Sequence, residues 1–336
     1  MCLYPTLRRN KRYVANAKNG GLVPSVYDTR VLAVPTKCGK CYECRKQSGR
    51  EWQIRLYEEI KTNKNGRMVT FTFSNESYRE LYNCSIWKKN RETGVKEMIA
   101  ISSLKGYDID NAIATIAMRR FNERYRKKYK KAIRHFMVTE LGHQGTENIH
   151  LHGIVWSNVS NAEITELWKY GFTWIGNEKW DTVINYVDES TVNYITKYIS
   201  KMDFEHKCYT PKILTSASMG KGYIDNINEH RFKEANTIQT YKSETGHEIA
   251  LPTYYRKKLW SDDEREALWL HMLDKKERYV CGERIDISDN DENYYKALNY
   301  HRKRVISLGY LDNSKAWERE QYEEERRELL QSKRLG

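Results

Sequence analysis

The 336-residue sequence lacks any apolar run of about 18 residues, and its mean hydropathy is −0.84, so no membrane-spanning helix is predicted. The opening residues MCLYPTLRRNKRY carry charges with no apolar stretch behind them. We therefore expect no signal peptide and a protein that stays in the cytosol where it is made. Internal repeats and low-complexity segments are also absent, and the 5 prolines and 18 glycines predict short linkers.

Acidic residues are fewer than basic ones, with 45 Asp and Glu against 58 Lys and Arg, which gives a net charge of +13. A polyanion is the partner that this charge favours, because each phosphate paired with a cation releases counterions. The seven cysteines are an odd number in a chain without an export signal, which argues against a disulfide framework.

The spacing of apolar residues predicts an α+β fold. Trp52, Leu56 and Ile60 recur at i, i+4 and i+8, which indicates a helix over 44–63, and the alternation in Arg67–Ser74 indicates a half-buried strand. Further elements are expected as a helix over 110–131 capped by Asp110, strands over 132–139 and 148–156, a helix over 162–170, strands over 171–176 and 182–187, a helix over 190–202 and a charged helix after Ser314.

The hairpin in the middle of this order favours a sandwich with a central antiparallel sheet flanked by helices over a doubly wound parallel sheet. We expect three parts. Residues 1–66 should hold an extended N-terminal arm over 1–37, a cysteine cluster and the first helix. Residues 67–205 should form the core, and residues 206–336 a mixed, partly helical C-terminal extension.

The segment NIHLHGIVW contains two histidines in the spacing of a strand. His150 and His152 would share one face of that strand, while the apolar residues between them share the other. Two imidazoles at i and i+2 begin a site for a divalent cation, and Glu140 at the end of the preceding strand is the candidate that completes it. The alternative is a pair of half-exposed histidines on a β surface.

The segment STVNYITKYISK predicts a helix with two different faces. At about 100° per residue, its Val and Ile side chains share one face, while Tyr194, Tyr198 and Lys201 lie on the opposite face, with Lys197 near them. A phenol is a poor nucleophile at its ordinary pKa of about 10, but a metal that polarises a phosphodiester and nearby cations can make it competent. The alternative is an amphipathic surface helix whose tyrosines fill a groove.

Cys38, Cys41 and Cys44 form a C-x2-C-x2-C motif, to which Cys2 could add a fourth sulfur from the arm. Three interpretations stay open: a structural zinc site that fastens the arm to the first helix, reduced thiols packed without metal, and an iron–sulfur cluster. Aromatic residues among basic ones, namely Tyr125, Tyr129, Tyr254 and Tyr255, could stack on unpaired bases.

Taken together, these motifs resemble a known family. Glu140, His150-Leu151-His152 and Tyr194-x3-Tyr198 resemble the metal and nucleophile motifs of the HUH (His-hydrophobic-His) endonucleases, and VTFTFS at 69–74 resembles their first-strand motif. The resemblance is closest to the replication initiation proteins of microviruses, in particular the gokushovirus-like group. Five segments carry it: MCLYP, CGKCYECRKQSGREWQIRL at 38–56, NYITKYISK at 193–201, SMGKGY at 218–223 and LPTYYRKKL at 251–259. Met219 departs from the family, whose glycine-rich turn often contains proline there.

The resemblance implies an HUH endonuclease fold and rolling-circle replication of a circular single-stranded phage genome. It implies nicking and later joining at an origin in single-stranded or supercoiled DNA, in the host bacterial cytoplasm, with host helicase and replication proteins as partners and no membrane. Glu140, His150 and His152 would hold one Mg²⁺ or Mn²⁺. Tyr194 or Tyr198 would attack and keep the 5′ phosphate, and Lys201 and Lys197 would stabilise charge.

Two other functions are compatible with the residues. One is a non-catalytic protein that binds single-stranded nucleic acid on a similar sheet, as recognition-motif domains do, with stacking aromatics on the sheet face. The other is a transposase or plasmid relaxase of the HUH type.

Overall fold

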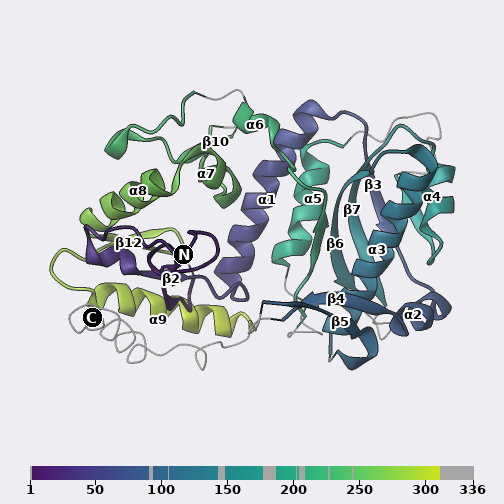
Figure 1. Ribbon diagram of the computed structural model, residues 1–336, viewed down its shortest axis with the longest axis horizontal. Coiled ribbons are helices and arrows are strands. Elements are labelled where there is room, and N and C mark those ends of the chain that lie inside the picture. The colour runs from purple at the N-terminus through teal and green to yellow at the C-terminus, as the bar shows by residue number, and fades with distance from the viewer. Residues whose placement is uncertain are drawn as a thin grey trace. The chain divides into compact units, whose positions relative to one another are not determined.

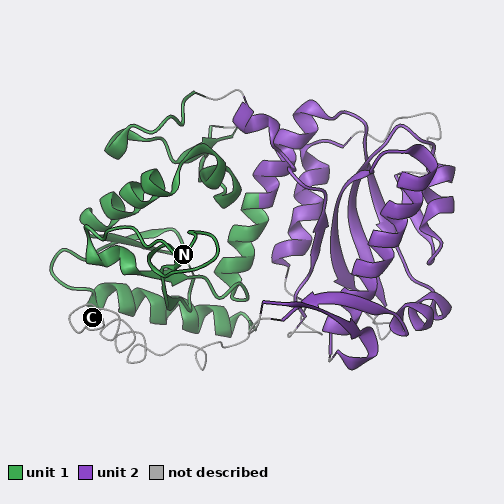
Figure 2. Ribbon diagram, in the orientation of Figure 1, with its two compact units in different colours: residues 1–51, 226–336 green, residues 52–225 purple. Residues whose placement is uncertain are grey.

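A computed structural model divides the chain into two compact units (Figure 2): unit 1 comprises residues 1–51 and 226–336, and unit 2 comprises residues 52–225. The structure describes residues 2–90, 94–104, 106–142, 148–176, 187–201, 203, 209–225, 228–243 and 246–310. The observed boundaries differ from the expected ones at 66/67 and 205/206. The reason is that the second half of the first helix and residues 209–225 pack with the sheet of unit 2.

A five-stranded antiparallel sheet forms the centre of unit 2 (Figure 1). In spatial order its strands are β8 (Thr173–Ile175), β3 (Gly66–Phe71), β7 (Ile149–Trp156), β6 (Arg134–Leu141) and β9 (Ile213–Thr215). Every neighbouring pair is antiparallel, and β6 and β7 are the predicted hairpin. The α+β class with a central antiparallel sheet is therefore confirmed.

Helices cover both faces of this sheet. We call one face the closed face, where α3 (Asp108–Tyr129), α4 (Asn161–Trp168) and α2 (Asn75–Tyr82) pack against the sheet in one apolar core. We call the other the site face, where the second half of α1 (Tyr42–Thr62) and α5 (Glu189–Ser200) pack around a smaller apolar core. The alternation of side chains along each strand sends neighbouring residues to these two cores.

The predicted helices and strands of unit 2 are present with shifted ends. The long helix α3 begins at Asp108 with Tyr107 as its N-cap, so the expected cap at Asp110 is wrong; Asp110 instead accepts a hydrogen bond of 2.8 Å from the Tyr78 hydroxyl. The structure adds elements that the spacing did not predict: α2 and the hairpin of β4 (Ser85–Lys89) and β5 (Lys96–Ala100). Residues 182–186 of a predicted strand and the predicted helix after Ser314 lie outside the described residues.

Gly153 lies in the middle of β7, directly opposite Met137 of β6. A Cβ atom at this position would overlap the backbone oxygen of Phe136 and would come within 2.8 Å of the Met137 Cα. The two strands thus approach so closely here that only glycine fits without displacing backbone.

Unit 1 joins the two ends of the chain in one apolar core. Residues 2–37 are not the expected extended arm, because Leu3 and Tyr4 are buried in this core and two strands of the segment pair with each other. The strands of unit 1 form three antiparallel pairs: β1 (Thr6–Arg9) with β2 (Ala33–Thr36), β10 (Thr240–Lys242) with β11 (Glu248–Ala250), and β12 (Glu277–Val280) with β13 (Glu283–Asp286). Its helices include α7 (Thr253–Leu259), α8 (Asp262–Asp274) and α9 (Glu292–Ser307), while α6 (Gly222–Asp225) ends unit 2.

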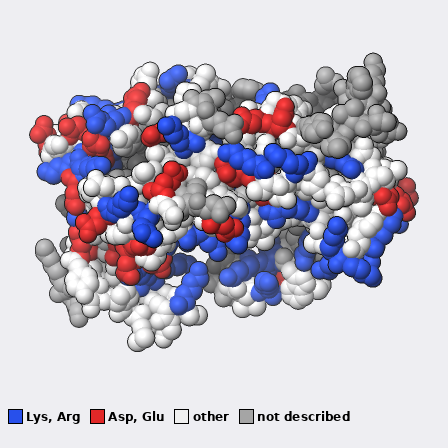
Figure 3. All heavy atoms as spheres, turned by 90° about the horizontal axis from the view of Figure 1, so that it is seen from above, with Lys and Arg blue, Asp and Glu red and all other residues white. Residues whose placement is uncertain are grey.

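Basic and acidic side chains both occur on the face shown in Figure 3, where Lys and Arg lie among Asp and Glu. Within the described part of the chain, none of the helices has the length and apolar character needed to cross a membrane.

Candidate active site

The register of β6 and β7 brings the predicted carboxylate and imidazoles to one place. Glu140 pairs directly with His150, and residues opposite each other in an antiparallel pair point to the same face. His152 lies two residues further along β7 and therefore points to that face as well. Glu140, His150 and His152 all stand on the site face, at the end where the strands leave the apolar core.

His152 is held through both of its ring nitrogens. Its Nε2 lies 3.0 Å from Glu140 Oε2, and its Nδ1 lies 3.0 Å from the hydroxyl oxygen of Thr70 on β3. These two contacts fix the orientation of the ring, as second contacts of metal-binding histidines do. Sequence reasoning placed Thr70 on this face of its strand but missed its contact with His152, because the contact depends on the pairing of β3 with β7.

Glu140 is ionised although it is largely buried. Burial disfavours the charged carboxylate, but hydrogen bonds from His152 and from Lys201, whose Nζ lies 2.7 Å from Glu140 Oε1, outweigh it and lower the pKa of Glu140. His150 has a pKa below its ordinary value, chiefly because of burial and then because of the nearby His152. Both groups are therefore in the protonation states that bind a cation.

The donor set of these three residues fits a divalent cation, since one carboxylate and two imidazoles suit Mn²⁺ and similar ions. The ring centroids of His150 and His152 are 6.2 Å apart. In the part of the chain that the structure describes, this trio does not bring one ligand atom from each member within 4.8 Å of the others; only the group of Cys2, Cys38, Cys41 and Cys44 meets that limit. Glu140 and His152 already converge, and His150 stands further out.

Helix α5 places the two tyrosines over this group. The Tyr198 ring stacks on the His152 ring with centroids 4.6 Å apart and planes inclined by 3°. The Tyr198 hydroxyl donates a hydrogen bond of 2.6 Å to the hydroxyl oxygen of Tyr194, which is 45% exposed. Burial, followed by the hydrogen bond with Tyr194, raises the pKa of Tyr198. The tyrosine pair thus extends from a buried ring over His152 to an exposed hydroxyl.

The apolar face of α5 explains this placement. Val192, Ile195 and Ile199 are buried in the core of the site face, so the opposite face of the helix carries the tyrosines, as the angular spacing predicts. Asp188 caps the helix by accepting a hydrogen bond of 2.9 Å from the backbone N–H of Thr191. Lys201 follows the last turn and reaches Glu140, whereas Lys197 is exposed.

A cavity of about 610 Å³ opens beside Tyr194. Its described lining residues come from β3, β8 and the start of α5: Met68, Thr70, Trp174, Ser190, Thr191 and Tyr194. The half-buried Trp174 pairs with Thr70 across β3 and β8, so its side chain shares the site face. No signal in the sequence singled out Trp174, because its position beside the tyrosines depends on the order of strands in the sheet.

Two of the tyrosines expected to stack on bases are core residues. Tyr125 is 1% exposed and shares a hydrogen bond of 2.8 Å with the Ser157 hydroxyl, and Tyr255 is fully buried. The Tyr129 hydroxyl donates to Glu163 at 2.5 Å. The base-stacking role predicted for Tyr125 and Tyr255 is therefore wrong, because their rings fill the apolar cores under the basic surface.

Comparison with known proteins supports the same region. Residues 67–203 match a family model of the replication-associated protein ORF2, and this span contains Glu140, both histidines and both tyrosines. Over 280 residues the chain is 26% identical to the replication-associated protein ORF2 of Spiroplasma virus 4, an alignment that covers 82% of this chain and 78% of that protein. No solved structure matches the chain. The chain is thus similar to viral replication-associated proteins, and the cysteine motif lies outside the span matched by the family model.

Proposed function

We propose that this protein initiates rolling-circle replication as a metal-dependent HUH endonuclease and strand transferase with a tyrosine nucleophile. The stacked pair of Tyr198 and His152 carries the proposal, because it brings phenol hydroxyls to a carboxylate and two imidazoles on one sheet face. On this proposal the substrate is the origin of a circular single-stranded phage genome of the gokushovirus-like microvirus group. The reaction takes place in the host bacterial cytoplasm, where host helicase and replication proteins extend the strand.

Each side chain of the site has a chemical role in this scheme. Glu140, His150 and His152 would hold Mg²⁺ or Mn²⁺, which when bound polarises the scissile phosphate and stabilises the leaving oxygen. Lys201, held 2.7 Å from Glu140 and with its Nζ 5.7 Å from the centre of the Tyr198 ring, favours negative charge on the phosphate or on a phenolate. Thr70 keeps the His152 ring oriented through Nδ1.

The covalent step exchanges one phosphate ester for another. A tyrosine oxygen attacks the phosphorus and forms a P–O bond, while the bond from phosphorus to the 3′ oxygen breaks. The phenol loses its proton to solvent and the leaving 3′ oxygen gains one, so that the protein keeps the 5′ phosphate as phosphotyrosine. The second tyrosine can then attack the regenerated origin, and the freed 3′ hydroxyl of the first strand can close the circle.

We assign the first attack to Tyr194. It is the more exposed of the pair, lines the 610 Å³ cavity, and its oxygen accepts the hydrogen bond from Tyr198, which stabilises charge on the attacking atom. Tyr198 is covered by His152 and would act in the second transfer.

Formation of a protein–DNA adduct tests the proposal. The full chain is incubated with labelled circular single-stranded origin DNA and Mn²⁺, and the adduct is digested for mass spectrometry. We expect the nucleotide on Tyr194 or Tyr198, with the adduct reduced more by Tyr194→Phe than by Tyr198→Phe and absent from the double variant. Tyr27→Phe is the control, since Tyr27 is 98% exposed and lies in unit 1.

An adduct on any other tyrosine would overturn the assignment. Tight binding of single-stranded DNA without an adduct in either Mg²⁺ or Mn²⁺ would favour a non-catalytic nucleic-acid-binding protein instead.

A further inference from the structure

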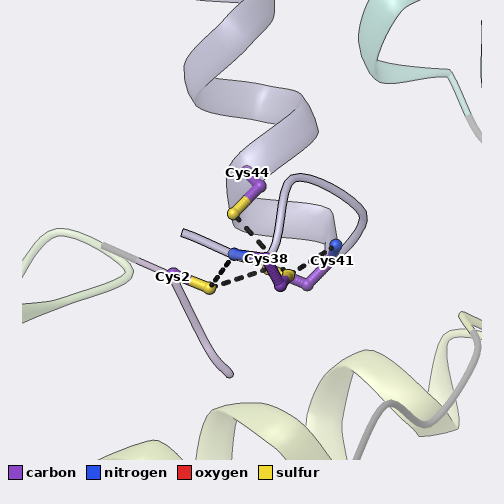
Figure 4. Close-up of side chains that lie close together, drawn as sticks. All are labelled: Cys2, Cys38, Cys41 and Cys44. Carbon is purple, nitrogen blue, oxygen red and sulfur yellow. Dashed lines mark hydrogen bonds between the residues drawn. The ribbon is translucent and has the colours of Figure 1, made fainter. Parts of the chain in front are cut away.

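Four cysteine side chains from distant parts of the sequence meet in unit 1 (Figure 4). Cys2 comes from the N-terminal segment, Cys38 and Cys41 from the turn before α1, and Cys44 from the first turn of α1. Their sulfur atoms all lie within 4.8 Å of one another. The pairing of β1 with β2 brings Cys2 to the motif, because it sets Thr6 opposite Thr36.

The spacing of the sulfur atoms distinguishes the three interpretations of this cluster. Cys2 Sγ lies 3.9 Å from Cys41 Sγ, and Cys38 Sγ lies 3.9 Å from Cys44 Sγ, whereas a disulfide bond measures about 2.05 Å. Zinc–sulfur bonds of about 2.3 Å in tetrahedral geometry separate ligand sulfurs by about 3.8 Å. An iron–sulfur cluster distributes its cysteines over different iron atoms and spaces their sulfurs further apart. The observed distances match a tetrahedral zinc site.

Backbone N–H groups point at these sulfur atoms. Cys2 Sγ accepts hydrogen bonds of 3.3 Å from the N–H of Tyr4 and of 3.3 Å from that of Cys38, and Cys38 Sγ accepts one of 3.4 Å from the N–H of Cys41. Gly39 provides the positive φ of 79° within the turn. N–H donors directed at sulfur stabilise thiolates, which are the form that binds metal.

The cluster is enclosed by apolar side chains. Cys2, Cys41 and Cys44 are buried in the same core as Leu3, Tyr4 and residues of β12 and α9. Four thiolates in such surroundings would repel one another, and a divalent cation is what can neutralise them. Neutral thiols would avoid this repulsion, but they would not require the converging N–H donors.

We propose that Cys2, Cys38, Cys41 and Cys44 bind one Zn²⁺ at a structural site that fastens residues 2–4 to the start of α1. Four protein ligands leave no open position, which is the arrangement of structural and not of catalytic zinc. The fastened segment is itself used by α9, since Arg302 Nη2 donates a hydrogen bond of 2.7 Å to the Leu3 carbonyl oxygen. The zinc thus stabilises the core that joins the two ends of the chain, independently of the proposed DNA chemistry.

Metal analysis of the full chain, purified without chelator, tests the stoichiometry. We expect about one zinc per chain, and replacement by Co²⁺ should give the charge-transfer and visible bands of a tetrahedral tetrathiolate. Iron with acid-labile sulfide, or stable protein that contains neither zinc nor iron, would overturn the proposal.

Cysteine variants test the location. Cys41→Ser should lose the zinc and lower the midpoint of thermal unfolding by about 10 °C, because structural zinc contributes folding free energy directly. Cys281→Ser is the matched control, since Cys281 packs against the same apolar core without belonging to the cluster. If Cys41→Ser does not fold, Cys2→Ser and the effect of a strong chelator on the wild-type unfolding midpoint take its place. Equal zinc content in the cluster variants and in Cys281→Ser would show that the ion binds elsewhere.

Discussion

The two faces of strand β7 place opposite demands on neighbouring residues. On the closed face, Leu151 and Val155 are fully buried against α3, and nothing there is available for chemistry. On the site face, Ile154 is also buried, but His150 and His152 lie beyond the apolar contacts of α5 and meet polar groups. The comparison shows that the site is the part of a packed face where the covering helix turns its tyrosines and lysine, instead of its isoleucines, toward the sheet.

The largest difference between the faces should appear on the site face. His152→Ala removes a proposed cation ligand and the ring under Tyr198, so nicking of origin DNA in Mg²⁺ should fall by at least about a thousandfold. Circular dichroism and thermal unfolding should show a folded protein with a modest stability loss. His150→Ala should behave similarly. Cleavage at the wild-type rate by both variants would disprove the metal assignment.

The neighbouring residue on the closed face should give the opposite result. Leu151→Ala leaves a cavity in a fully buried position and should reduce the free energy of unfolding by about 3 kcal/mol, as measured by urea denaturation. Nicking by the folded fraction at low temperature should remain close to wild type. A loss of activity that exceeds the loss of folded protein would mean that the closed face also shapes the site.

A smaller effect is expected for the residue that orients His152. Thr70→Val keeps the shape of the side chain but removes the hydroxyl near Nδ1, which should weaken Mn²⁺ binding and nicking by about tenfold. Titration of activity with Mn²⁺ separates the two effects, because excess metal should restore most of the rate. Thr72→Val, on the same strand face, serves as the control. An unchanged metal dependence would assign Thr70 to packing alone.

The smallest effect concerns a histidine on the closed face. Burial lowers the pKa of His135 below its ordinary value of 6.5, so the unfolded chain binds the proton more readily than the folded one. The stability contributed by neutral His135 is therefore present above pH 6.5 and decreases as the pH falls below it, by at most about 1.4 kcal/mol at pH 5.5. Urea denaturation at both pH values should show a weaker pH dependence for His135→Gln. An equal dependence would assign it to other groups.

The sequence predicts those features that depend on residues close to one another. Helix α5, with its apolar and tyrosine faces, and the β6–β7 hairpin follow from periodicity over a dozen residues. The contact of Thr70 with His152 and the place of Trp174 depend on strand pairing, which periodicity does not determine. The fold of residues 2–37 was missed because β1 pairs with a strand almost thirty residues away, and β4 and β5 were missed because their mostly exposed side chains alternate little.

The close approach at Gly153 has a consequence for how reliably β6 and β7 align during folding. A shift of one residue would place Leu or Ile side chains of β7 against the Phe136 carbonyl, where even a Cβ atom overlaps. The same shift would send both histidines to the opposite face of the sheet. Misaligned hairpins are therefore penalised at one point in the backbone, and the alignment that survives is the one in which Glu140 faces His150. Gly153 acts as a proofreading position for the site although it contributes no side chain to it.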